Sequence, residues 1–305
     1  MSNVLVSVIM PAYNAALYIG EAIQSVVNQT HTNWELVIVD DGSTDDTAAE
    51  ARQIVENDLR IKYIYQPNGK QGKARNTGIK QANGTYIAFL DADDLWIPNT
   101  LEVLVKQLST SADVDMVFAQ GYFKNGHDLK NYDTVTKSRW DKSDLKLLCE
   151  YNQVPILSVL VKKKALLSVG YFSELSEIQK LEDYHLWLKM MISGYKFQSI
   201  PERLFYYRLH GSQSTFGDTH NQFRSFSVYK DLYYAFDDVS SRKVIINRLK
   251  WMLFDANLYP GVMQIAQFHF KSKGKKFISS IFESGLLLSQ YLMSKLGFQL
   301  IKIYG

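Results

Sequence analysis

The stretch YIAFLDADD, residues 86–94, decides the fold, because an apolar run ends there directly in three aspartates. Aromatic, β-branched and small apolar residues at 86–90 are typical of a buried strand. Carboxylates repel one another and resist burial, so a fold rarely gathers Asp91, Asp93 and Asp94 without a cation or solvent beside them. The stretch therefore predicts a buried strand whose carboxyl end opens into a polar site.

Similar strands recur through the first 120 residues and alternate with amphipathic helical patterns. The strand-like stretches are VLVSVIM (4–10), WELVIVDDGS (34–43), IKYIYQ (61–66) and VDMVFAQGYF (114–123). The helical patterns between them lie at 17–27, 44–58, 73–82 and 99–110. Near-continuous apolar strands separated by amphipathic helices predict an α/β fold with a Rossmann-like, mostly parallel sheet and helices on both faces.

The rest of the chain is less regular. Residues 121–150 are polar and poorly periodic, which predicts a loop with a short helix. Residues 154–170 predict a strand and a helix, 181–194 a helix, and 197–214 a strand followed by a loop. From about residue 221 the pattern is helical, aromatic and basic.

Composition sets limits on the class of protein. The chain has 305 residues, 46% hydrophobic and 21% charged, which is enough for a sizeable core. Its one cysteine, Cys149, excludes an internal disulfide framework and a cysteine-based zinc site. No basic leader precedes the first apolar stretch, and no window of about 20 residues is apolar enough to span a bilayer. We therefore expect a cytoplasmic protein, or one peripheral to the cytoplasmic membrane face.

Charge divides the chain into two regions. Residues 1–220 carry 22 Lys and Arg against 26 Asp and Glu, whereas residues 221–305 carry 12 against 5. A weakly acidic region followed by a basic one indicates different partners for the two.

Three strand ends are polar: PAYN (11–14), DDGS (40–43) and DADD (91–94). In open parallel sheets, ligands bind beyond the carboxyl ends of the strands. Asp91 and Asp93 are two apart, so in an extended strand end they point the same way and suit Mg²⁺ or Mn²⁺. The alternative is a helix N-cap at Asp93 or Asp94, which explains one aspartate of the three.

The first two strand ends suggest a nucleotide pocket. Tyr13 offers a flat ring for a base, and Asp40 and Asp41 lie at the mouth of the sheet. A simple strand-to-helix turn with Ser43 or Thr44 as N-cap explains most of DDGSTDDT as well. Neither a dinucleotide-binding nor a P-loop glycine pattern is present.

Basic side chains offer partners for an anion. Lys70, Lys73 and Arg75 lie near a predicted helix start and suit a diphosphate, or else form an ordinary solvated loop. In YYRLHGSQS (206–214), Arg208 can bind phosphate, and His210 can either ligate a metal or have only a structural role.

The pair Glu182 and Asp183 in LEDYHLW (181–187) suggests acid–base chemistry. Adjacent residues on a helix face different directions, so we expect at most one of them to point into a cleft. A carboxylate there has a raised pKa and becomes a better general base, whereas an isolated acidic pair is usually surface charge.

Taken in order, VSVIMPAYN, WELVIVDDGSTDDT, ARNTGI, YIAFLDADD, VGYFSE, EDYHLWLKM and YRLHGSQS resemble the family 2 glycosyltransferases of the GT-A fold. The resemblance covers residues 5 to about 215. It implies a metal-dependent, inverting hexosyl- or hexosaminyltransferase that uses a nucleotide-diphospho-sugar, with 1–220 as the catalytic domain. Asp183 would be the catalytic base, with Glu182 beside it, and Mn²⁺ or Mg²⁺ would be held by Asp93, Asp91 and His210. The implied nucleotide-sugar-binding residues are Pro11, Ala12, Tyr13, Asn14, Asp40, Asp41, Lys73, Arg75, Asp91, Ala92 and Arg208.

One departure from the family indicates transfer of a single sugar. Processive members carry a Gln-x-x-Arg-Trp motif and membrane spans. Here TKSRW (136–140) has Thr136 in place of glutamine, and it lies before the acidic pair. A non-catalytic nucleotide-sugar binding module remains an alternative, and so, less favoured, does a sugar nucleotidyltransferase, although the latter's glycine-rich basic signature is missing from MPAYNAALYIG.

Residues 221–305 combine aromatic and basic residues, including Tyr229, Trp251, Lys271 and Lys273. Such helices can lie on an anionic membrane surface, which fits a carbohydrate or lipid-linked saccharide acceptor in bacterial capsule, polysaccharide or lipooligosaccharide synthesis. The alternative is a packed helical subdomain that supports a homo-oligomer. The acidic first region and the lack of any nucleic-acid motif disfavour a nucleic-acid partner.

Overall fold

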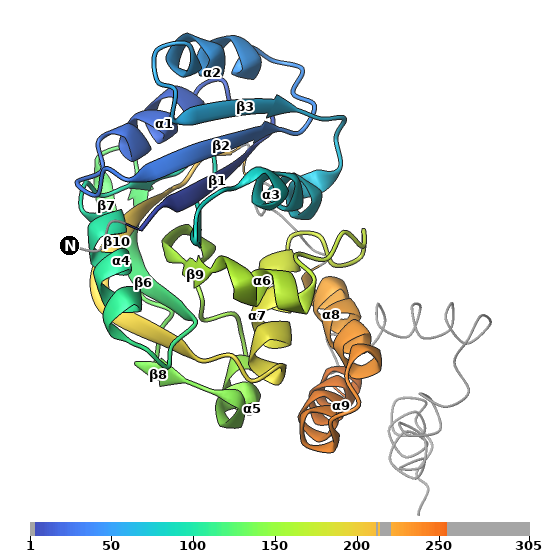
Figure 1. The fold of residues 1–305 in the computed structure, drawn as a ribbon. Coiled ribbons are helices and arrows are strands. Elements are labelled where there is room, and N and C mark those ends of the chain that lie inside the picture. Colours follow the sequence, from blue (N-terminus) through green and yellow to red (C-terminus); the bar gives the residue numbers. More distant parts are fainter. Residues whose placement is uncertain (1–3, 212, 214–220, 255–305) are drawn as a thin grey trace, which may run out of the picture. The chain divides into compact units, whose positions relative to one another are not determined.

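A computed structural model describes residues 4–211, 213 and 221–254 (Figure 1). The chain divides between Asp218 and Thr219 into two compact units. The predicted rhythm of strands and helices is present in the first unit.

The described residues of the first unit form ten strands, with helices between most of them. The strands are β1 (Val6–Ala12), β2 (Trp34–Asp40), β3 (Ile61–Tyr65), β4 (Tyr86–Phe89), β5 (Leu95–Trp96), β6 (Met116–Asn125), β7 (Asp128–Tyr132), β8 (Arg139–Trp140), β9 (Leu160–Lys162) and β10 (Phe197–Arg208). The helices are α1 (Ile19–Val27), α2 (Thr47–Val55), α3 (Lys70–Gln81), α4 (Thr100–Thr110), α5 (Leu145–Leu148), α6 (Lys163–Val169) and α7 (Glu182–Ile192). Two short 3₁₀ turns are η1 (Lys142–Asp144) and η2 (Ile156–Ser158).

All ten strands belong to one sheet, in which eight form the order β3-β2-β1-β4-β9-β6-β10-β5. The neighbours β3, β2, β1 and β4 are parallel, as are β6 and β10. Strand β9 runs antiparallel between β4 and β6. The sheet is therefore mixed, and its parallel half matches the prediction.

Helices cover both faces of the parallel half (Figure 1). Alternation along β1 sends Val8 and Met10 into the core that α1 and α4 share, and sends Ile9 toward α3. Gly78 lets α3 approach the sheet, because a Cβ there would lie 2.5 Å from Cγ2 of Ile9. Burying each large aliphatic side chain contributes roughly 1.5–3 kcal/mol. This packing fixes α3, which carries Arg75, against the sheet.

Residues 121–150 contain the predicted short helix, α5, but also a hairpin in place of the predicted loop. Strand β6 extends to Asn125 and pairs with β7 through the two-residue turn Gly126-His127, where Gly126 has a φ of +59°. Glycine at the first position of a two-residue turn is a known hairpin signal, which the weak periodicity of the segment concealed. The hairpin brings Tyr132 back over the carboxyl end of the sheet.

The aspartates at 91–94 do not extend β4, and they cap no helix. The strand ends at Phe89, and the Asp94 N–H donates to the Asp91 carbonyl in a turn. Residues 95–96 form β5, and the next helix begins only at Thr100. The extended strand end and the N-cap at Asp93 or Asp94 are therefore both wrong, because β5 pairs with β10 at this point.

In the second unit, α8 (Asn221–Ala235) and α9 (Val239–Phe254) pack against each other. Asp238 accepts the Ser241 N–H at 2.8 Å, and the Arg242 Nε donates to the Phe236 carbonyl at 2.6 Å. These bonds close the turn between the two helices. Among the described residues, no helix has the length and apolar content needed to cross a membrane.

Candidate functional site

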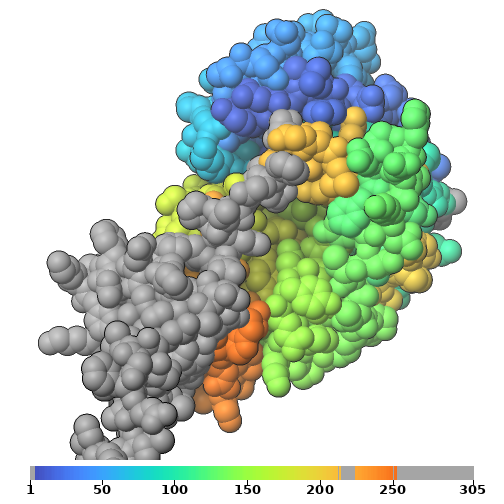
Figure 2. Space-filling view, turned by 180° about the vertical axis from the view of Figure 1, so that it is seen from behind, coloured from blue at the N-terminus to red at the C-terminus, as the bar shows by residue number. Residues whose placement is uncertain are grey.

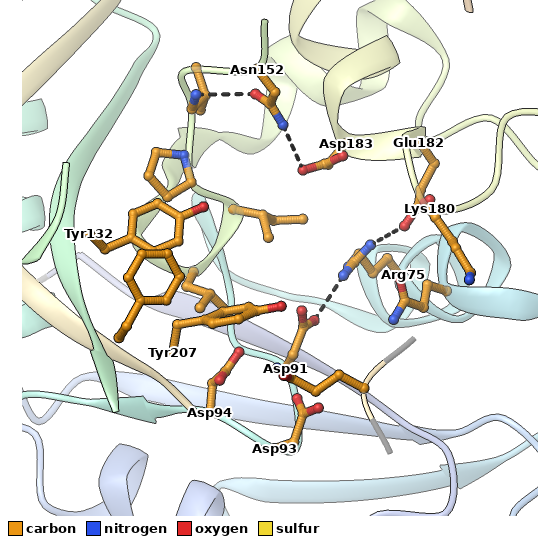
Figure 3. A pocket seen from close by; sticks show the side chains of 17 residues that line it. Arg75, Asp91, Asp93, Asp94, Tyr132, Asn152, Lys180, Glu182, Asp183 and Tyr207 are labelled. Atoms are coloured by element: carbon orange, nitrogen blue, oxygen red, sulfur yellow. Dashed lines mark hydrogen bonds and ion pairs between the residues drawn. The ribbon is translucent and has the colours of Figure 1, made fainter. Parts of the chain in front are cut away.

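A cavity of about 370 Å³ lies beyond the carboxyl ends of the central strands (Figure 3). One wall is charged and comes from α3, the turn at 91–94 and the start of α7. The other wall is aromatic and apolar and comes from β6, β7, β10 and the segment 152–157. A cavity with one polar and one apolar wall suits a ligand such as a sugar, which has both kinds of surface.

Arg75 ties the charged wall together. Its Nη1 lies 2.5 Å from Oε1 of Glu182, and its Nη2 lies 2.8 Å from Oδ1 of Asp91. The Arg75 side chain is only 2% exposed, so Arg75 is the centre of a buried ion-pair cluster. The alternative that it lies in a solvated loop is therefore wrong for this residue. Breaking a buried pair of this kind by removing one partner costs about 3–5 kcal/mol. Arg75 thereby fixes the side chains of two segments that lie 91 residues apart.

The aspartate turn carries more negative charge than its neighbours neutralise. Burial, together with the nearby charge of Asp91, raises the pKa of Asp93. Burial also raises the pKa of Asp94 well above its usual value, and Asp93 and Asp91 add to this rise. Asp94 accepts the backbone N–H of Arg208 at 2.8 Å. The turn is therefore ready to accept a proton or a cation.

Asp183 lies at the start of α7 on the cavity side. Its Oδ2 accepts from Nδ2 of Asn152 at 3.1 Å, and its Oδ1 accepts from the Tyr184 N–H at 2.6 Å. Burial and the neighbouring Glu182 raise the pKa of Asp183 to about 7, although Arg75 opposes this. Both acidic residues line the cavity, so the expectation that at most one would do so is wrong. Glu182 turns to Arg75, and Asp183 stays toward the open space (Figure 3).

The aromatic wall comes from the hairpin and from β10. The rings of Phe123, Tyr132 and Tyr207 pack together, with centroids 4.6–6.0 Å apart. Burial raises the pKa of Tyr132, as do the nearby Tyr207 and Asp183, so its hydroxyl stays protonated. Figure 3 shows Tyr132 and Tyr207 on the side of the cavity opposite Glu182 and Asp183.

The end of β10 borders the aspartate turn. Nε2 of His210 lies 3.2 Å from Oδ2 of Asp93, and its ring stacks on Tyr18 at 4.5 Å between centroids. Arg208 donates from Nη1 to Glu21, while its Nε and Nη2 are buried without a hydrogen-bond partner among the described residues. Buried unpaired guanidinium donors suit an anion such as phosphate. Figure 2 shows this golden segment beside the blue N-terminal residues.

The strand ends PAYN and DDGS are joined by hydrogen bonds. The Asn14 N–H donates to Oγ of Ser43 at 3.0 Å, and the Thr44 N–H donates to Oδ1 of Asn14 at 2.8 Å. Neither Ser43 nor Thr44 is the N-cap of α2, which begins at Thr47 instead. Tyr13 is 53% exposed beside them. The two loops therefore form one preformed unit that presents an aromatic ring.

Asp40 and Asp41 are buried and fully engaged. Asp40 accepts from the Ser43 N–H and from the Tyr63 hydroxyl. Asp41 accepts from the Gly69 and Lys70 N–H groups at 2.8 Å each. Asp41 thus holds the first N–H groups of α3, the positive end of the helix dipole.

The donor set suits a hard divalent cation at the aspartate turn. Carboxylates whose pKa values are raised by burial and by mutual repulsion gain from such a cation. Within residues 4–211, 213 and 221–254, no group of three or more His, Cys, Asp or Glu is arranged to hold a metal ion. Mg²⁺ commonly uses one or two carboxylates and completes its shell with water and substrate phosphate. Asp93, with Asp91 and His210 adjacent, fits that pattern.

The structure brings some of the predicted site residues together and leaves others apart. The cavity is lined by Arg75, Asp91, Asp93, Glu182 and Asp183. Arg208 and His210 contact its acidic rim. The predicted residues that do not line it are Pro11, Ala12, Tyr13, Asn14, Asp40, Asp41, Lys73 and Ala92. The cavity residues that sequence reasoning did not single out include Gln71, Tyr132, Asn152, Lys180 and Tyr207.

Comparison with known proteins gives a consistent assignment. The model of the family described as Glycosyl transferase family 2 matches residues 7–175. An uncharacterized glycosyltransferase of Haemophilus influenzae is 37% identical over 171 residues, which are 54% of this chain and 65% of the relative. An uncharacterized glycosyltransferase of Rickettsia prowazekii is 32% identical and is matched over 76% of this chain and 71% of its own length. The UDP-Glc:alpha-D-GlcNAc-diphosphoundecaprenol beta-1,3-glucosyltransferase WfgD of Escherichia coli is 34% identical and is matched over 63% of this chain and 71% of its own length.

Solved structures share the fold at low sequence identity. Residues 1–349 of S. aureus TarS, in complex with UDP-GlcNAc, superpose with a TM-score of 0.66 at 20% identity, covering 89% of this chain and 77% of that one. The mannosyltransferase PcManGT of Pyrobaculum calidifontis, in complex with GDP-Man and Mn²⁺, gives 0.58 at 20% identity, covering 94% and 80%. The predicted α/β fold of the GT-A type is thus confirmed. On the family match and the relatives above 30% identity, the chain belongs to glycosyltransferase family 2.

Proposed function

We propose that this protein is an inverting glycosyltransferase that moves one sugar from a nucleotide-diphospho-sugar to an acceptor hydroxyl. The observation that carries the proposal is Asp183, a half-buried carboxylate with a pKa of about 7 that faces the aspartate turn across one cavity. A group with that pKa is matched to proton transfer near neutral pH.

Asp183 acts as the general base. The acceptor oxygen forms a bond to the anomeric carbon while the bond from that carbon to the diphosphate oxygen breaks. The electron pair leaves with the nucleoside diphosphate, and the hydroxyl proton passes to Asp183. Attack from the face opposite the leaving group inverts the anomeric configuration.

Donor binding is assigned to three groups of residues. Tyr13 takes the nucleobase, with Pro11 to Asn14 and the DDGS loop around it. Asp91, fixed by Arg75, faces the sugar, since both line the cavity. Arg208, with two buried unpaired donors, and Lys73 meet the diphosphate.

Asp93 holds Mn²⁺ or Mg²⁺, with Asp91 and His210 beside it. When bound, such an ion supplies charge neutralisation for the departing diphosphate. His210 in turn is oriented by its stacking on Tyr18, which fixes its ring toward Asp93.

A UDP-sugar is the first donor to test, and a lipid-linked saccharide is the first acceptor. The name of the E. coli relative, which specifies UDP-Glc and a diphosphoundecaprenol-linked sugar, supports both choices. The excess of basic residues in 221–305 supports contact with the cytoplasmic membrane face in cell-surface polysaccharide synthesis. Lys271 and Lys273 lie outside the described residues.

The first experiment is thermal unfolding with UDP, GDP, dTDP and CDP, each with Mn²⁺, Mg²⁺ or EDTA. A ligand at 100 times its dissociation constant stabilises the fold by about 2.7 kcal/mol, which raises Tm by several degrees. We expect a metal-dependent rise for one nucleotide, and we expect Asp93→Ala to lose it. No rise with any nucleotide would reject the proposal. Nucleotide binding without turnover of any UDP-sugar would instead favour a non-catalytic binding module.

A further inference from the structure

Asn152 lies in the segment between α5 and η2, and nothing in its sequence context marks it as functional. Its side chain is half-buried and sits between two partners (Figure 3). Nδ2 donates to Oδ2 of Asp183 at 3.1 Å, and Oδ1 accepts the N–H of Val154 at 3.1 Å. The contact with Asp183 spans 31 positions of the chain.

The chemistry of the two partners fixes how the Asn152 amide points. A backbone N–H can only donate, so the Asn152 oxygen must face Val154. An ionised carboxylate can only accept, so the Asn152 nitrogen must face Asp183. A rotation of the amide by 180° would place oxygen against carboxylate and nitrogen against N–H. The amide is therefore held in the one orientation that favours a charged Asp183.

The other groups around Asp183 have opposing effects on its ionisation. Glu182 on the same helix and Asp91 in the aspartate turn disfavour its charge, whereas Arg75 on α3 favours it. Tyr132 on β7 stays neutral, and Lys180 lines the same cavity. Arg75 is shared between Glu182 and Asp91, to which it donates directly. Asn152 differs from Arg75 in that it donates to Asp183 directly.

We infer that Asn152 is a positioning residue for the proton acceptor, which holds the Asp183 carboxylate by its Oδ2 and favours its ionised form. The inference rests on the proposed function of Asp183. Oδ1 of Asp183 accepts the Tyr184 N–H, and Oδ2 accepts from Asn152, so these two bonds fix the plane of the carboxylate. The lone pairs that remain are the ones available to the acceptor hydroxyl.

The test uses Asn152→Asp, which keeps the size and shape of the side chain, beside Asn152→Ala. The control is Tyr151→Phe, because Tyr151 is the neighbouring residue on the same segment and is 46% exposed. Release of UDP from UDP-glucose or UDP-GlcNAc, with water as the acceptor, is measured from pH 5 to 10 in the full-length protein.

The acidic limb of the profile of kcat/KM reports the ionisation of the base. We expect Asn152→Ala to move this limb upward by about one pH unit, because the charged form loses a hydrogen bond. Asn152→Asp should move it further, since a second carboxylate replaces the donor. Activity should fall about tenfold on the acidic limb and recover at high pH, and Tyr151→Phe should match the wild type.

Two results would overturn the inference. One is an Asn152→Asp profile that superimposes on the wild type, and the other is an equal loss at every pH, which a structural role would give. A double-mutant cycle of Asn152→Ala and Asp183→Asn in urea unfolding serves as a readout without turnover. Coupling that is larger at pH 9 than at pH 5 supports the inference, and coupling that does not change with pH rejects it. Full activity in Asp183→Asn would reject the proposed function instead, whatever the cycle shows.

Discussion

The two acidic regions at the carboxyl edge of the sheet differ in how their charges are satisfied. Asp40 and Asp41 are buried, and their carboxylate oxygens accept hydrogen bonds from the chain itself. Asp94 is also buried, and Asp93 and Asp183 are partly buried, but the pKa values of all three are raised because their partners do not offset the cost of burial. The carboxylates of the first region are satisfied by the folded chain alone, whereas those of the second are satisfied only by a proton, a cation or a ligand.

The aspartates of the first region therefore serve the fold, and those of the second serve chemistry. A satisfied buried carboxylate stabilises the structure, and its loss should lower the free energy of unfolding. A carboxylate with a raised pKa destabilises the structure when charged, so its removal should leave the fold intact and abolish function.

The largest effect is expected for Asp183→Asn. The amide keeps the shape but cannot accept the proton, so turnover of a UDP-sugar should fall by about 10²–10⁴-fold. Nucleotide binding, measured by thermal shift, should persist. Turnover within about twofold of the wild type would remove Asp183 from the role of base.

The same substitution should stabilise the fold at high pH. The folded pKa of Asp183, about 7, lies above its unfolded value of 3.8. Its neutral form therefore stabilises the fold below about pH 4, and this contribution is lost as the pH rises through 7. We expect the unfolding free energy of Asp183→Asn, relative to wild type, to increase by at most about 4 kcal/mol from pH 4 to pH 8. Urea titrations at the two pH values give this difference, and a constant offset would contradict the raised pKa.

Asp41→Ala should behave in the opposite way and lower stability at neutral pH. The substitution removes the acceptor for the Gly69 and Lys70 N–H groups at the start of α3 and for Nε2 of Gln66. A loss of about 3 kcal/mol is expected in urea unfolding. The matched control is Asp46→Ala, an exposed aspartate without a side-chain cap bond, which should change stability by less than about 0.5 kcal/mol. An equal loss of unfolding free energy in both variants would contradict a structural role for Asp41.

The smallest effect is expected for Arg139→Ala, in the TKSRW stretch that departs from the processive motif. Arg139 pairs with Asp113 at the surface, where both side chains are more than half exposed. Surface pairs contribute little, so Tm and turnover of a UDP-sugar should be unchanged. A tenfold loss of turnover would mean that this stretch takes part in the reaction after all.

The sequence predicts the parallel half of the sheet well, because strands such as 34–40 are near-continuous apolar runs that need no distant partner to be recognised. It also predicts the charged wall, because acidic side chains at strand ends are rare without a purpose. It does not predict the aromatic wall. Tyr132 belongs to a hairpin whose polar, exposed strand resembles a loop.

Asn152 and Asp41 show a second limit of prediction from the sequence. Asparagine in a loop carries no signal of its own, and the partner of Asn152 lies on another element that tertiary packing brings close. Asp41 matched a nucleotide-pocket pattern, but the residues that engage it lie at 66–70, on the far side of β3 in the sequence. Which of two adjacent motifs is satisfied internally depends on such contacts, and the spacing of residues does not encode them.

The most direct test is a crystal structure of the full-length protein with Mn²⁺ and the nucleotide sugar selected by thermal unfolding. We expect the metal and diphosphate beside Asp93, the sugar ring in the cavity between Asp91 and Asp183, and Asp40 and Asp41 with their present hydrogen bonds. A donor bound away from this cavity, or one that draws Asp41 out of its contacts with α3 while Asp183 stays remote from the sugar, would contradict this expectation.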